Sequence, residues 1–252
     1  MTFYKRIQNN ASRGIKSLSV LIDPDGIKSN NLGLITDLVN VHDIDFFLVG
    51  GSLLLEDKMD TTIRFLKKNS DKPVVLFPGN EIQLHDAADA ILFLSLISGR
   101  NAEYLISKHV VAAPKIRTMD IEVVPTGYML IHGQRQSTAS YISATLPIPD
   151  DKPEIAAATA LAGQYLGHQL LYLEGGSGAT RPISNKTIKA VRQAVNVPII
   201  VGGGIKNANQ MQDIYISGAD IQVIGTAIER KPELLEEFSN VKKHINQQFS
   251  TI

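Results

Sequence analysis

The chain has 252 residues, of which 44% are hydrophobic and 20% are charged, a composition typical of globular proteins rather than of disordered or fibrous ones. Its 25 basic and 25 acidic residues give a formal net charge of zero, without the basic excess expected of a nucleic-acid-binding protein. It contains no cysteine, which excludes disulfides, thiolate–zinc sites, iron–sulfur clusters and cysteine nucleophiles.

The apolar runs of the chain are short. The first ten residues contain no apolar core of signal-peptide length. Runs such as Ala90–Leu94 and Val197–Val201 are far too short to span a bilayer. We therefore expect a soluble, cytoplasmic protein without a transmembrane segment, and this expectation is compatible with a lipid substrate.

Eight short runs of aliphatic and β-branched residues recur along the chain, and most of them are continuous rather than alternating. This pattern is typical of parallel strands that are buried on both faces. The predicted strands are Leu18–Asp23, Asp45–Val49, Val74–Phe77, Ala90–Leu94, Ile121–Pro125, Leu170–Glu174, Pro198–Val201 and Ile221–Ile224.

Amphipathic patterns between these strands predict helices, with Ser184 as an N-cap. The predicted helices are Asn31–Val41, Asp57–Lys68, Ala102–Val110, Glu154–Gly167, Ser184–Val195, Asn207–Gly218 and Pro232–Phe249. Asn80–Ala88 is too short for a full helix, and Ser140–Pro153 is predicted to be a loop. Alternating strands and helices over this length predict one (β/α)8 TIM barrel, an α/β fold, as a single domain of residues 1–252. An open doubly wound sheet is the alternative.

The predicted strands end in polar or glycine-rich sequences, and the C-terminal strand ends are where barrels carry their chemistry. A tight turn after a strand would explain a glycine at any one of these ends. Turns alone explain less well why the ends of the last three strands are all rich in glycine. The ends are Asp23-Pro24-Asp25-Gly26, Gly50-Gly51-Ser52, Pro78-Gly79-Asn80, Ser95 with Ser98–Asn101, Thr126-Gly127-Tyr128, Glu174–Gly178, Gly202-Gly203-Gly204 and Gly225-Thr226.

The ends of the last two strands predict a phosphate site. Gly203 and Gly204, with Gly225 and Thr226, allow backbone N–H groups to approach an anion closely near helix N-termini. The run Gly202–Asn207 lacks the last glycine of the dinucleotide-binding fingerprint, and no Walker A sequence is present.

Four oxygen-bearing side chains stand at three other strand ends. Asp23 and Asp25 are either turn-capping residues or ligands of a hard cation such as Mg²⁺, with the Ser52 hydroxyl as a further ligand. Glu174 ends an apolar strand, where a carboxylate costs free energy unless it is paired or functional. It is a candidate general base or a ligand of a substrate hydroxyl.

These segments resemble the geranylgeranylglyceryl phosphate synthases and their bacterial relatives, the heptaprenylglyceryl phosphate synthases. The most specific match is Tyr172–Ala179, and the matches run in order over nearly the whole chain. The other matching segments are Leu21–Asp25, Phe47–Ser52, Val75–Gly79, Val201–Ile205 and Gly225–Ala227.

The resemblance implies a Mg²⁺-dependent phosphoglycerol geranylgeranyltransferase. Its substrates are geranylgeranyl diphosphate and sn-glycerol 1-phosphate, whose C3 hydroxyl attacks the prenyl C1 to form an ether and release diphosphate in phospholipid biosynthesis. Asp23 and Ser52 match the metal ligands, and Glu174 and Asp23 are the implied catalytic residues. The residues that match the glycerol 1-phosphate site are Tyr172, Leu173, Glu174, Gly175, Gly176, Ser177, Gly178, Gly203, Gly204, Gly225 and Thr226.

One departure points to a branch of the family. Leu21 stands where one branch carries a lysine, so the chain resembles the other, longer branch, whose members often assemble beyond the dimer. We therefore expect a homo-oligomer, dimer or hexamer. Arg100 is either a diphosphate partner or a surface arginine, and Tyr141 is either an inter-subunit anchor or a packed loop residue.

An apolar groove for the prenyl tail is expected across the barrel top. Core packing is the alternative reading for Phe77 and Phe93 in particular. The candidate lining residues are Phe77, Phe93, Ile97, Tyr104 and Tyr128.

Two rival functions use the same barrel. A phosphate-sugar isomerase, aldolase or cyclase would share the phosphate site, but an aldolase wants a Schiff-base lysine, and Lys115 and Lys206 are poorly placed for one. A non-catalytic phosphate-binding protein would not need Asp23. The six histidines show no metal-ligand spacing, and Lys242–His244 on the last helix is expected to be a solvated face.

Overall fold

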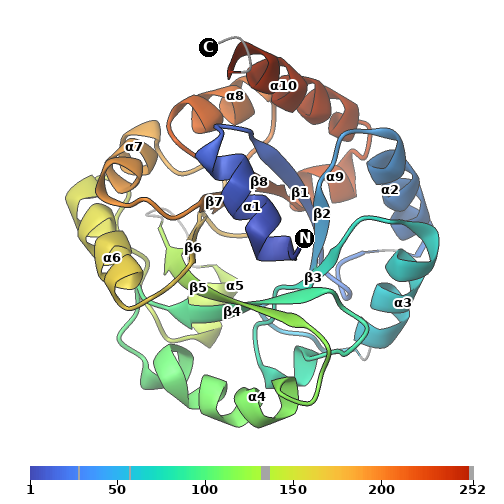
Figure 1. The fold of residues 1–252 in the computed structure, drawn as a ribbon, viewed down its shortest axis with the longest axis horizontal. Coiled ribbons are helices and arrows are strands. Elements are labelled where there is room, and N and C mark those ends of the chain that lie inside the picture. The colour runs from blue at the N-terminus through green and yellow to red at the C-terminus, as the bar shows by residue number, and fades with distance from the viewer. Residues whose placement is uncertain (28, 57, 132–136, 250–252) are drawn as a thin grey trace.

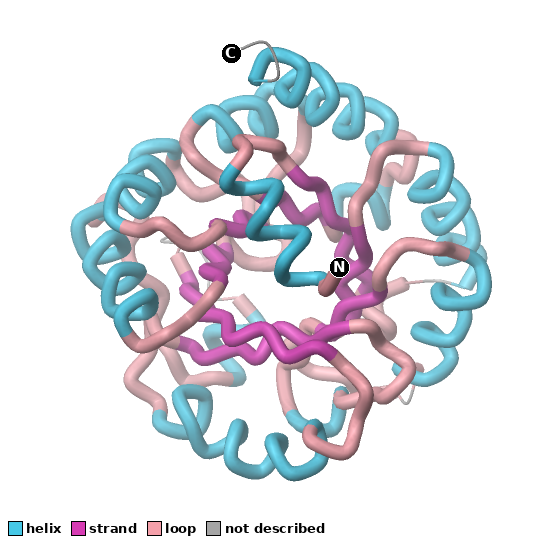
Figure 2. Tube along the Cα trace, in the orientation of Figure 1, coloured by secondary structure: helices cyan, strands magenta, loops and turns pink. Residues whose placement is uncertain are grey.

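The computed structural model describes residues 1–27, 29–56, 58–131 and 137–249. Eight parallel strands follow one another in chain order around a closed barrel, and β1 pairs with β8 to complete the ring. The helices form an outer layer around the strands (Figures 1 and 2). The TIM barrel is therefore confirmed, and the closure of the sheet excludes the open doubly wound alternative.

The strands agree closely with the predicted ones. Leu170–Glu174 and Ile221–Ile224 have the predicted bounds, whereas β5 continues past its predicted end at Pro125 to Leu130. The strands are β1 Ser17–Ile22, β2 Phe46–Val49, β3 Val74–Leu76, β4 Ala90–Leu96, β5 Glu122–Leu130, β6 Leu170–Glu174, β7 Ile199–Gly202 and β8 Ile221–Ile224.

All seven predicted helices are present, with shifted bounds. The hydroxyl of Ser184 accepts a hydrogen bond from the backbone N–H of Thr187, as expected of an N-cap. The helices are α1 Phe3–Ser12, α2 Ser29–Val41, α3 Met59–Asn69, η1 Glu81–Gln83, η2 Glu103–Ser107, α4 Lys108–Ile116, α5 Thr138–Ile142, α6 Pro153–Tyr165, α7 Asn185–Ala194, α8 Ala208–Ile216, α9 Thr226–Arg230 and α10 Leu234–Phe249.

Several helical features differ from the prediction. The helix predicted at Ala102–Val110 begins as the π-helical turn η2 and continues as α4 through Pro114 to Ile116, because later residues of α4 also pack on the barrel. The loop predicted at Ser140–Pro153 contains the end of α5. Helices α1, α5 and α9 were not predicted; α5 and α9 have five residues each, too few to show a helical period.

Helix α1 closes the N-terminal end of the barrel. It crosses the centre of the ring in Figures 1 and 2. The Phe3 ring packs edge-on against that of Phe46, with 5.0 Å between centroids. The carboxylate of Glu122 accepts hydrogen bonds from the backbone N–H groups of Phe3 and Tyr4 at 2.5 and 3.1 Å. The opposite end, formed by the C-terminal strand ends, is left for a ligand.

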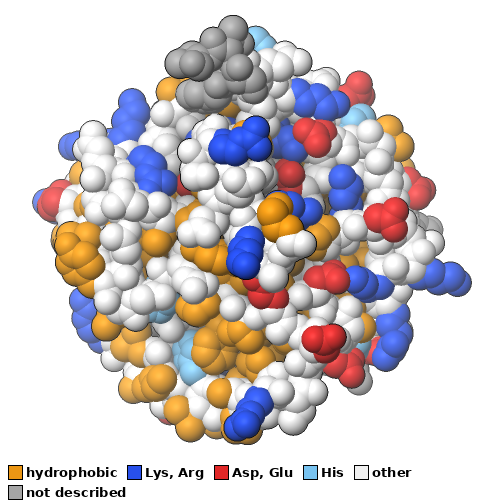
Figure 3. All heavy atoms as spheres, viewed as in Figure 1, with side chains coloured by type: hydrophobic (Ala, Val, Ile, Leu, Met, Phe, Trp, Pro, Cys, Tyr) orange, Lys and Arg blue, Asp and Glu red, His pale blue; other side chains and the backbone are white. Residues whose placement is uncertain are grey.

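The core has two parts that follow from the alternation of side chains along each strand. One fills the barrel interior and includes Phe46, Leu48 and Tyr172, and the other lies between the strands and the outer helices. Acidic and basic side chains are interspersed over the N-terminal face (Figure 3). No helix of the described residues is both long and apolar enough to cross a bilayer.

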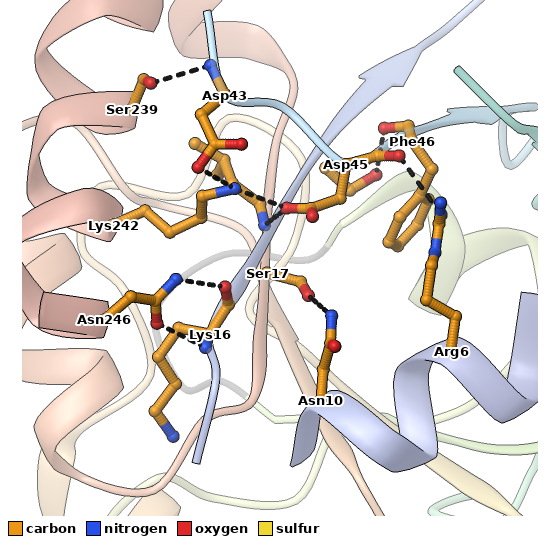
Figure 4. A network of polar contacts seen from close by, with 12 residues as sticks. Arg6, Asn10, Lys16, Ser17, Asp43, Asp45, Phe46, Ser239, Lys242 and Asn246 are labelled. Atoms are coloured by element: carbon orange, nitrogen blue, oxygen red, sulfur yellow. Dashed lines mark hydrogen bonds and ion pairs between the residues drawn. The ribbon is translucent and has the colours of Figure 1, made fainter. Parts of the chain in front are cut away.

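A polar network joins α10 to the N-terminal ends of β1 and β2 (Figure 4). The Lys242 ammonium lies 2.8 Å from the carboxylates of both Asp43 and Asp45 and is only 2% exposed. The Asp45 carboxylate also accepts the Leu18 N–H at 2.7 Å. The prediction of a solvated Lys242–His244 face was therefore wrong for Lys242. Its acidic partners lie far earlier in the chain, so the local sequence of the helix does not reveal them.

Candidate functional site

A cavity of about 400 Å³ lies at the C-terminal end of the barrel and gathers most of the predicted site residues. It is lined by residues that belong to or directly follow every strand except β4, and by residues of helices α5, α9 and α10. Those predicted from the sequence are Asp23, Ser52, Tyr172, Glu174, Gly176, Ser177, Gly178, Gly203, Gly204, Gly225 and Thr226.

Glu174 ends β6 and is buried, with 7% of its surface exposed. Its Oε1 accepts a hydrogen bond from the Gly176 N–H at 2.6 Å, and its carboxylate also accepts one from the Tyr172 hydroxyl. Burial raises the pKa of Glu174 to about 7, although both hydrogen bonds act in the opposite direction. A carboxylate with this pKa can accept a proton near neutral pH, as a general base requires.

Glycines after β6 and β7 bring backbone close to Glu174. Gly203 has φ +87°, and a Cβ there would lie 2.8 Å from Glu174 Oε1 and 2.7 Å from the Gly176 nitrogen. Gly204 has φ +75°, and a Cβ there would meet the backbone of Arg181. On the β8 side, the Thr226 hydroxyl lies 3.3 Å from that of Ser177. These loops therefore lie close together and form one wall of the polar cavity.

Asp23 follows β1, and its side chain is fixed by backbone. Its Oδ1 accepts the N–H groups of Asp25 at 3.0 Å and Gly26 at 3.4 Å. Burial raises the pKa of Asp23, and these backbone hydrogen bonds oppose that effect. A Cβ on Gly51 would lie 3.1 Å from Asp23 Oδ2, so the backbone beside Ser52 passes close to this carboxylate.

The donor set around Asp23 fits a hard cation that also binds substrate oxygens. Asp23 and Ser52 line the same cavity, and the Oδ1 of Asp25 is buried without a hydrogen-bond partner in the described part of the chain. No three His, Cys, Asp or Glu side chains among the described residues could hold a metal by themselves. Mg²⁺ commonly takes one or two carboxylates and completes its shell with water and phosphate oxygens, so this sparse set is compatible with it.

A second, apolar cavity of about 110 Å³ lies between β4, η2 and α4. Of the predicted tail-binding residues, Phe77, Phe93, Tyr104 and Tyr128 line it, whereas Ile97 belongs to the core outside the barrel. The two cavities meet, because five residues line both of them. These are Gly51, Ser52, Phe77, Tyr128 and Ala139.

Aromatic rings form the boundary between the cavities. The ring of Phe77 stacks on that of Tyr172 with centroids 4.9 Å apart and meets Tyr128 edge-on at 5.7 Å. Burial and the nearby Glu174 raise the pKa of both tyrosine hydroxyls well above their usual value, so they remain protonated. The sequence predicted a strand that ends at Pro125, with Tyr128 in the segment that follows it. In the structure Tyr128 lies within β5 instead.

Other predicted residues lie away from the cavities. The Leu173 side chain is fully buried against the outer helices, and Gly175 donates its N–H to Gly202 O at 2.9 Å, so neither lines the polar cavity. Arg100 lines neither cavity, and one of its guanidinium nitrogens donates to Gly99 O at 2.7 Å. Tyr141 is 71% exposed on α5.

Sequence reasoning missed a group of charged residues after β8. Glu229, Arg230 and Lys231 line the polar cavity. Burial, and then the charge of Asp23, raise the pKa of Glu229. The Gly225-Thr226 strand end could have indicated them. A short helix that begins at Thr226 places the residues of its next turn beside the same cavity.

Comparisons with known proteins agree with this geometry. Residues 15–243 match the PcrB family. A geranylgeranylglyceryl phosphate synthase of Spirosoma linguale is 48% identical over 93% of this chain and 94% of its own length. The one of Chitinophaga pinensis is 43% identical over 94% of each chain.

A solved structure shares both fold and sequence with the chain. It is (S)-3-O-geranylgeranylglyceryl phosphate synthase from Thermoplasma acidophilum in complex with its substrate sn-glycerol-1-phosphate. It is 31% identical, with a TM-score of 0.91 over 98% of this chain and 99% of its own. By sequence and by fold, the chain belongs to the PcrB family.

Proposed function

We propose that the protein transfers the geranylgeranyl group of geranylgeranyl diphosphate to the C3 hydroxyl of sn-glycerol 1-phosphate, with Mg²⁺ as cofactor. The observation that carries this proposal is the junction of a polar cavity and an apolar cavity at Ser52, Phe77 and Tyr128. The relatives named as geranylgeranylglyceryl phosphate synthases, one of them bound to sn-glycerol-1-phosphate, support the choice of substrates.

The polar cavity suits glycerol 1-phosphate. Its phosphate binds the backbone N–H groups around Gly203, Gly204 and Gly225, which line this cavity at the ends of β7 and β8. Glu174 then accepts a hydrogen bond from the glycerol hydroxyl and takes its proton, which its pKa of about 7 permits.

The reaction breaks the bond between prenyl C1 and the diphosphate and forms a bond from C1 to the glycerol C3 oxygen. The hydroxyl proton passes to Glu174, and diphosphate leaves. The aromatic rings of Phe77 and Tyr128 line both cavities where these meet, and they stabilise positive charge that develops at C1. Asp23 and Ser52 are the proposed ligands of Mg²⁺, which when bound neutralises charge on the diphosphate.

The apolar cavity suits the prenyl tail. Its lining follows β4 from Leu96 down to Ile91, a length of about 17 Å at ~3.3 Å per residue. This length is of the order of an extended geranylgeranyl chain, which supports that donor over much longer prenyl diphosphates.

The test is a turnover assay with sn-glycerol 1-phosphate, Mg²⁺ and prenyl diphosphates of increasing length. We expect an ether product with geranylgeranyl diphosphate preferred, and we expect it to be lost without metal and in Asp23→Asn. A folded protein that binds glycerol phosphate yet forms no ether with any prenyl diphosphate would refute the proposal. Lys206, which was expected to be poorly placed for a Schiff base, does line the polar cavity. Its ammonium group donates a hydrogen bond to Thr180 O at 2.8 Å, so the rival aldolase is less suited to the site.

Assembly beyond the monomer is part of the proposal. The exposed apolar side chains Tyr141 and Leu146, 71% and 87% exposed, are available for contacts between subunits. Light scattering after size-exclusion chromatography would give the subunit number, and a monomer at micromolar concentration would contradict the expected oligomer.

A further inference from the structure

The segment Gly51–Glu56, between β2 and α3, carries Ser52 and forms neither helix nor strand. A segment without regular structure has no internal hydrogen-bond ladder, so other parts of the protein must fix its path. Ser52 lines both cavities, so its position matters to the proposed reaction.

The first half of this segment is held by Gln83, on η1. The Gln83 side chain donates to Gly51 O at 2.8 Å and accepts the Gly51 N–H at 3.3 Å and the Gly79 N–H at 3.2 Å. With 1% of its surface exposed, Gln83 is a buried amide that joins the ends of β2 and β3. It therefore fixes the backbone immediately before Ser52.

The second half is held by Asp25, from the end of β1. The Asp25 Oδ2 accepts the Leu55 N–H at 2.5 Å and the Glu56 N–H at 3.3 Å. The backbone N–H of the same residue donates to Asp23 Oδ1 at 3.0 Å. Asp25 thus contacts Asp23 through its backbone and the Ser52 segment through its side chain.

We propose that Asp25 is a positioning residue whose carboxylate holds the backbone of Leu55 and Glu56 and thereby keeps Ser52 beside Asp23. The inference rests on the proposed metal-binding role of Asp23 and Ser52. Hydrogen bonds from backbone N–H to a carboxylate are stronger than those to a neutral acceptor, so Asp25 is suited to hold an otherwise irregular segment.

The first test measures the hydrogen bonds themselves. Amide hydrogen exchange is followed over residues 53–56 in the wild type, Asp25→Ala, Asp25→Asn and the control Asp37→Asn, an exposed aspartate on α2. We expect exchange to be about tenfold faster in Asp25→Ala, less so in Asp25→Asn, which keeps an acceptor oxygen, and unchanged in the control. Unchanged exchange in Asp25→Ala would overturn the inference.

The second test measures the consequence for the metal site without turnover. Binding of Mn²⁺, used as a spectroscopic probe in place of Mg²⁺, is titrated by electron paramagnetic resonance, and sn-glycerol 1-phosphate is titrated calorimetrically without metal. We expect Asp25→Ala to weaken Mn²⁺ binding about tenfold and to leave glycerol phosphate affinity within about twofold. Wild-type Mn²⁺ affinity in this variant, equal loss of both ligands, or no Mn²⁺ binding by the wild type would each overturn the inference.

Failure of this inference can be distinguished from failure of the proposed function. If the wild type forms no ether product, the transferase proposal fails whatever the metal titration shows. If the wild type forms the ether and Asp25→Ala binds Mn²⁺ normally, only the positioning role of Asp25 fails.

Discussion

Glu174 shows how one residue couples stability to chemistry. It lies in a buried position at the wall of the polar cavity, where burial disfavours its charged form more than two hydrogen bonds favour it. The same environment that makes the carboxylate costly to bury raises its pKa to the range useful to a general base. Glu174 therefore lowers the stability of the protein at neutral pH, and its raised pKa suits the proposed role of general base.

We predict that Glu174→Gln removes both effects. The unfolded chain loses the Glu174 proton near pH 4.5, whereas the folded protein keeps it until about pH 7, so this group's stabilising contribution falls as pH rises between those values. The free energy of unfolding of the variant, relative to that of the wild type, should therefore increase by about 3 kcal/mol between about pH 5 and about pH 8. This value follows from 1.36 kcal/mol per unit of pKa shift. Guanidinium unfolding at both pH values measures this gain.

The kinetic consequence has the opposite sign. In the wild type, kcat/KM should rise with pH through about 7 as Glu174 ionises, and Glu174→Gln should lose at least about 100-fold in kcat/KM. If the free energies of unfolding of the two proteins change with pH in parallel, Glu174 does not titrate as this environment requires. If the variant stays active, Glu174 is not the proton acceptor.

At the scale of elements, the two ends of the barrel have separate roles. The C-terminal strand ends carry Asp23, Ser52 and Glu174, whereas the N-terminal ends are tied by α1 and by the Lys242 network of α10. In Figure 4 the side chains of α10 and α1 approach β1 and β2 from opposite sides. Such contacts at the N-terminal end stabilise the fold without touching the reaction.

We predict that Lys242→Met destabilises the protein by about 2–3 kcal/mol, because it leaves the Asp43 and Asp45 carboxylates without their buried cation. This value lies below that of a fully buried pair, since both carboxylates are partly exposed and screened by water. Lys243→Met, at the exposed neighbouring position, should change stability by less than about 0.5 kcal/mol.

Chemical denaturation gives both stabilities, and turnover under conditions where both variants are folded gives the activity. We expect kcat to stay unchanged in both variants, since the network lies at the end of the barrel opposite the site. Equal stabilities of Lys242→Met and Lys243→Met would show that the buried ion pairs contribute nothing beyond a surface lysine.

At the scale of the whole molecule, the barrel and its outer helices form two unlike cavities that adjoin, and in the proposed reaction each cavity holds one substrate. The polar cavity is formed by strand ends, whereas the apolar one lies between a strand and helix α4. One cavity is more polar than the other, and the residues Ser52, Phe77 and Tyr128, which line both, mark the proposed place of reaction. In the proposed reaction, α4 would therefore limit the length of the prenyl tail.

We predict that Ala112→Phe shortens the preferred prenyl donor. Ala112 is 7% exposed on α4 and lines the apolar cavity, so a phenyl ring there fills space that the end of the tail occupies. In competition assays the ratio of geranylgeranyl to farnesyl transfer should fall at least about tenfold, with glycerol phosphate KM unchanged. Val111→Phe, at a 64% exposed position, is the control, and an equal shift in both variants would place the tail elsewhere.

The sequence by itself determined the barrel, the order of its strands and most of the polar cavity. Continuous apolar runs identify buried parallel strands, and the residue after each run must lie at the same end of a barrel, so Asp23, Ser52, Glu174 and Gly203 could be placed together. The Tyr172–Ala179 match was specific enough to indicate the family, which the comparisons confirm.

Only the tertiary structure decided which side chains meet across the barrel. Partners far apart in the chain, such as Lys242 with Asp45 and Asp25 with Leu55, leave no local pattern in sequence. The raised pKa of Glu174 depends on burial by several strands at once, and the apolar cavity depends on how η2 and α4 pack on β4. The local periodicity of the sequence specifies the helices and strands and where they end. Packing between distant segments specifies the protonation of buried groups, the shape of the cavities and the contacts between side chains.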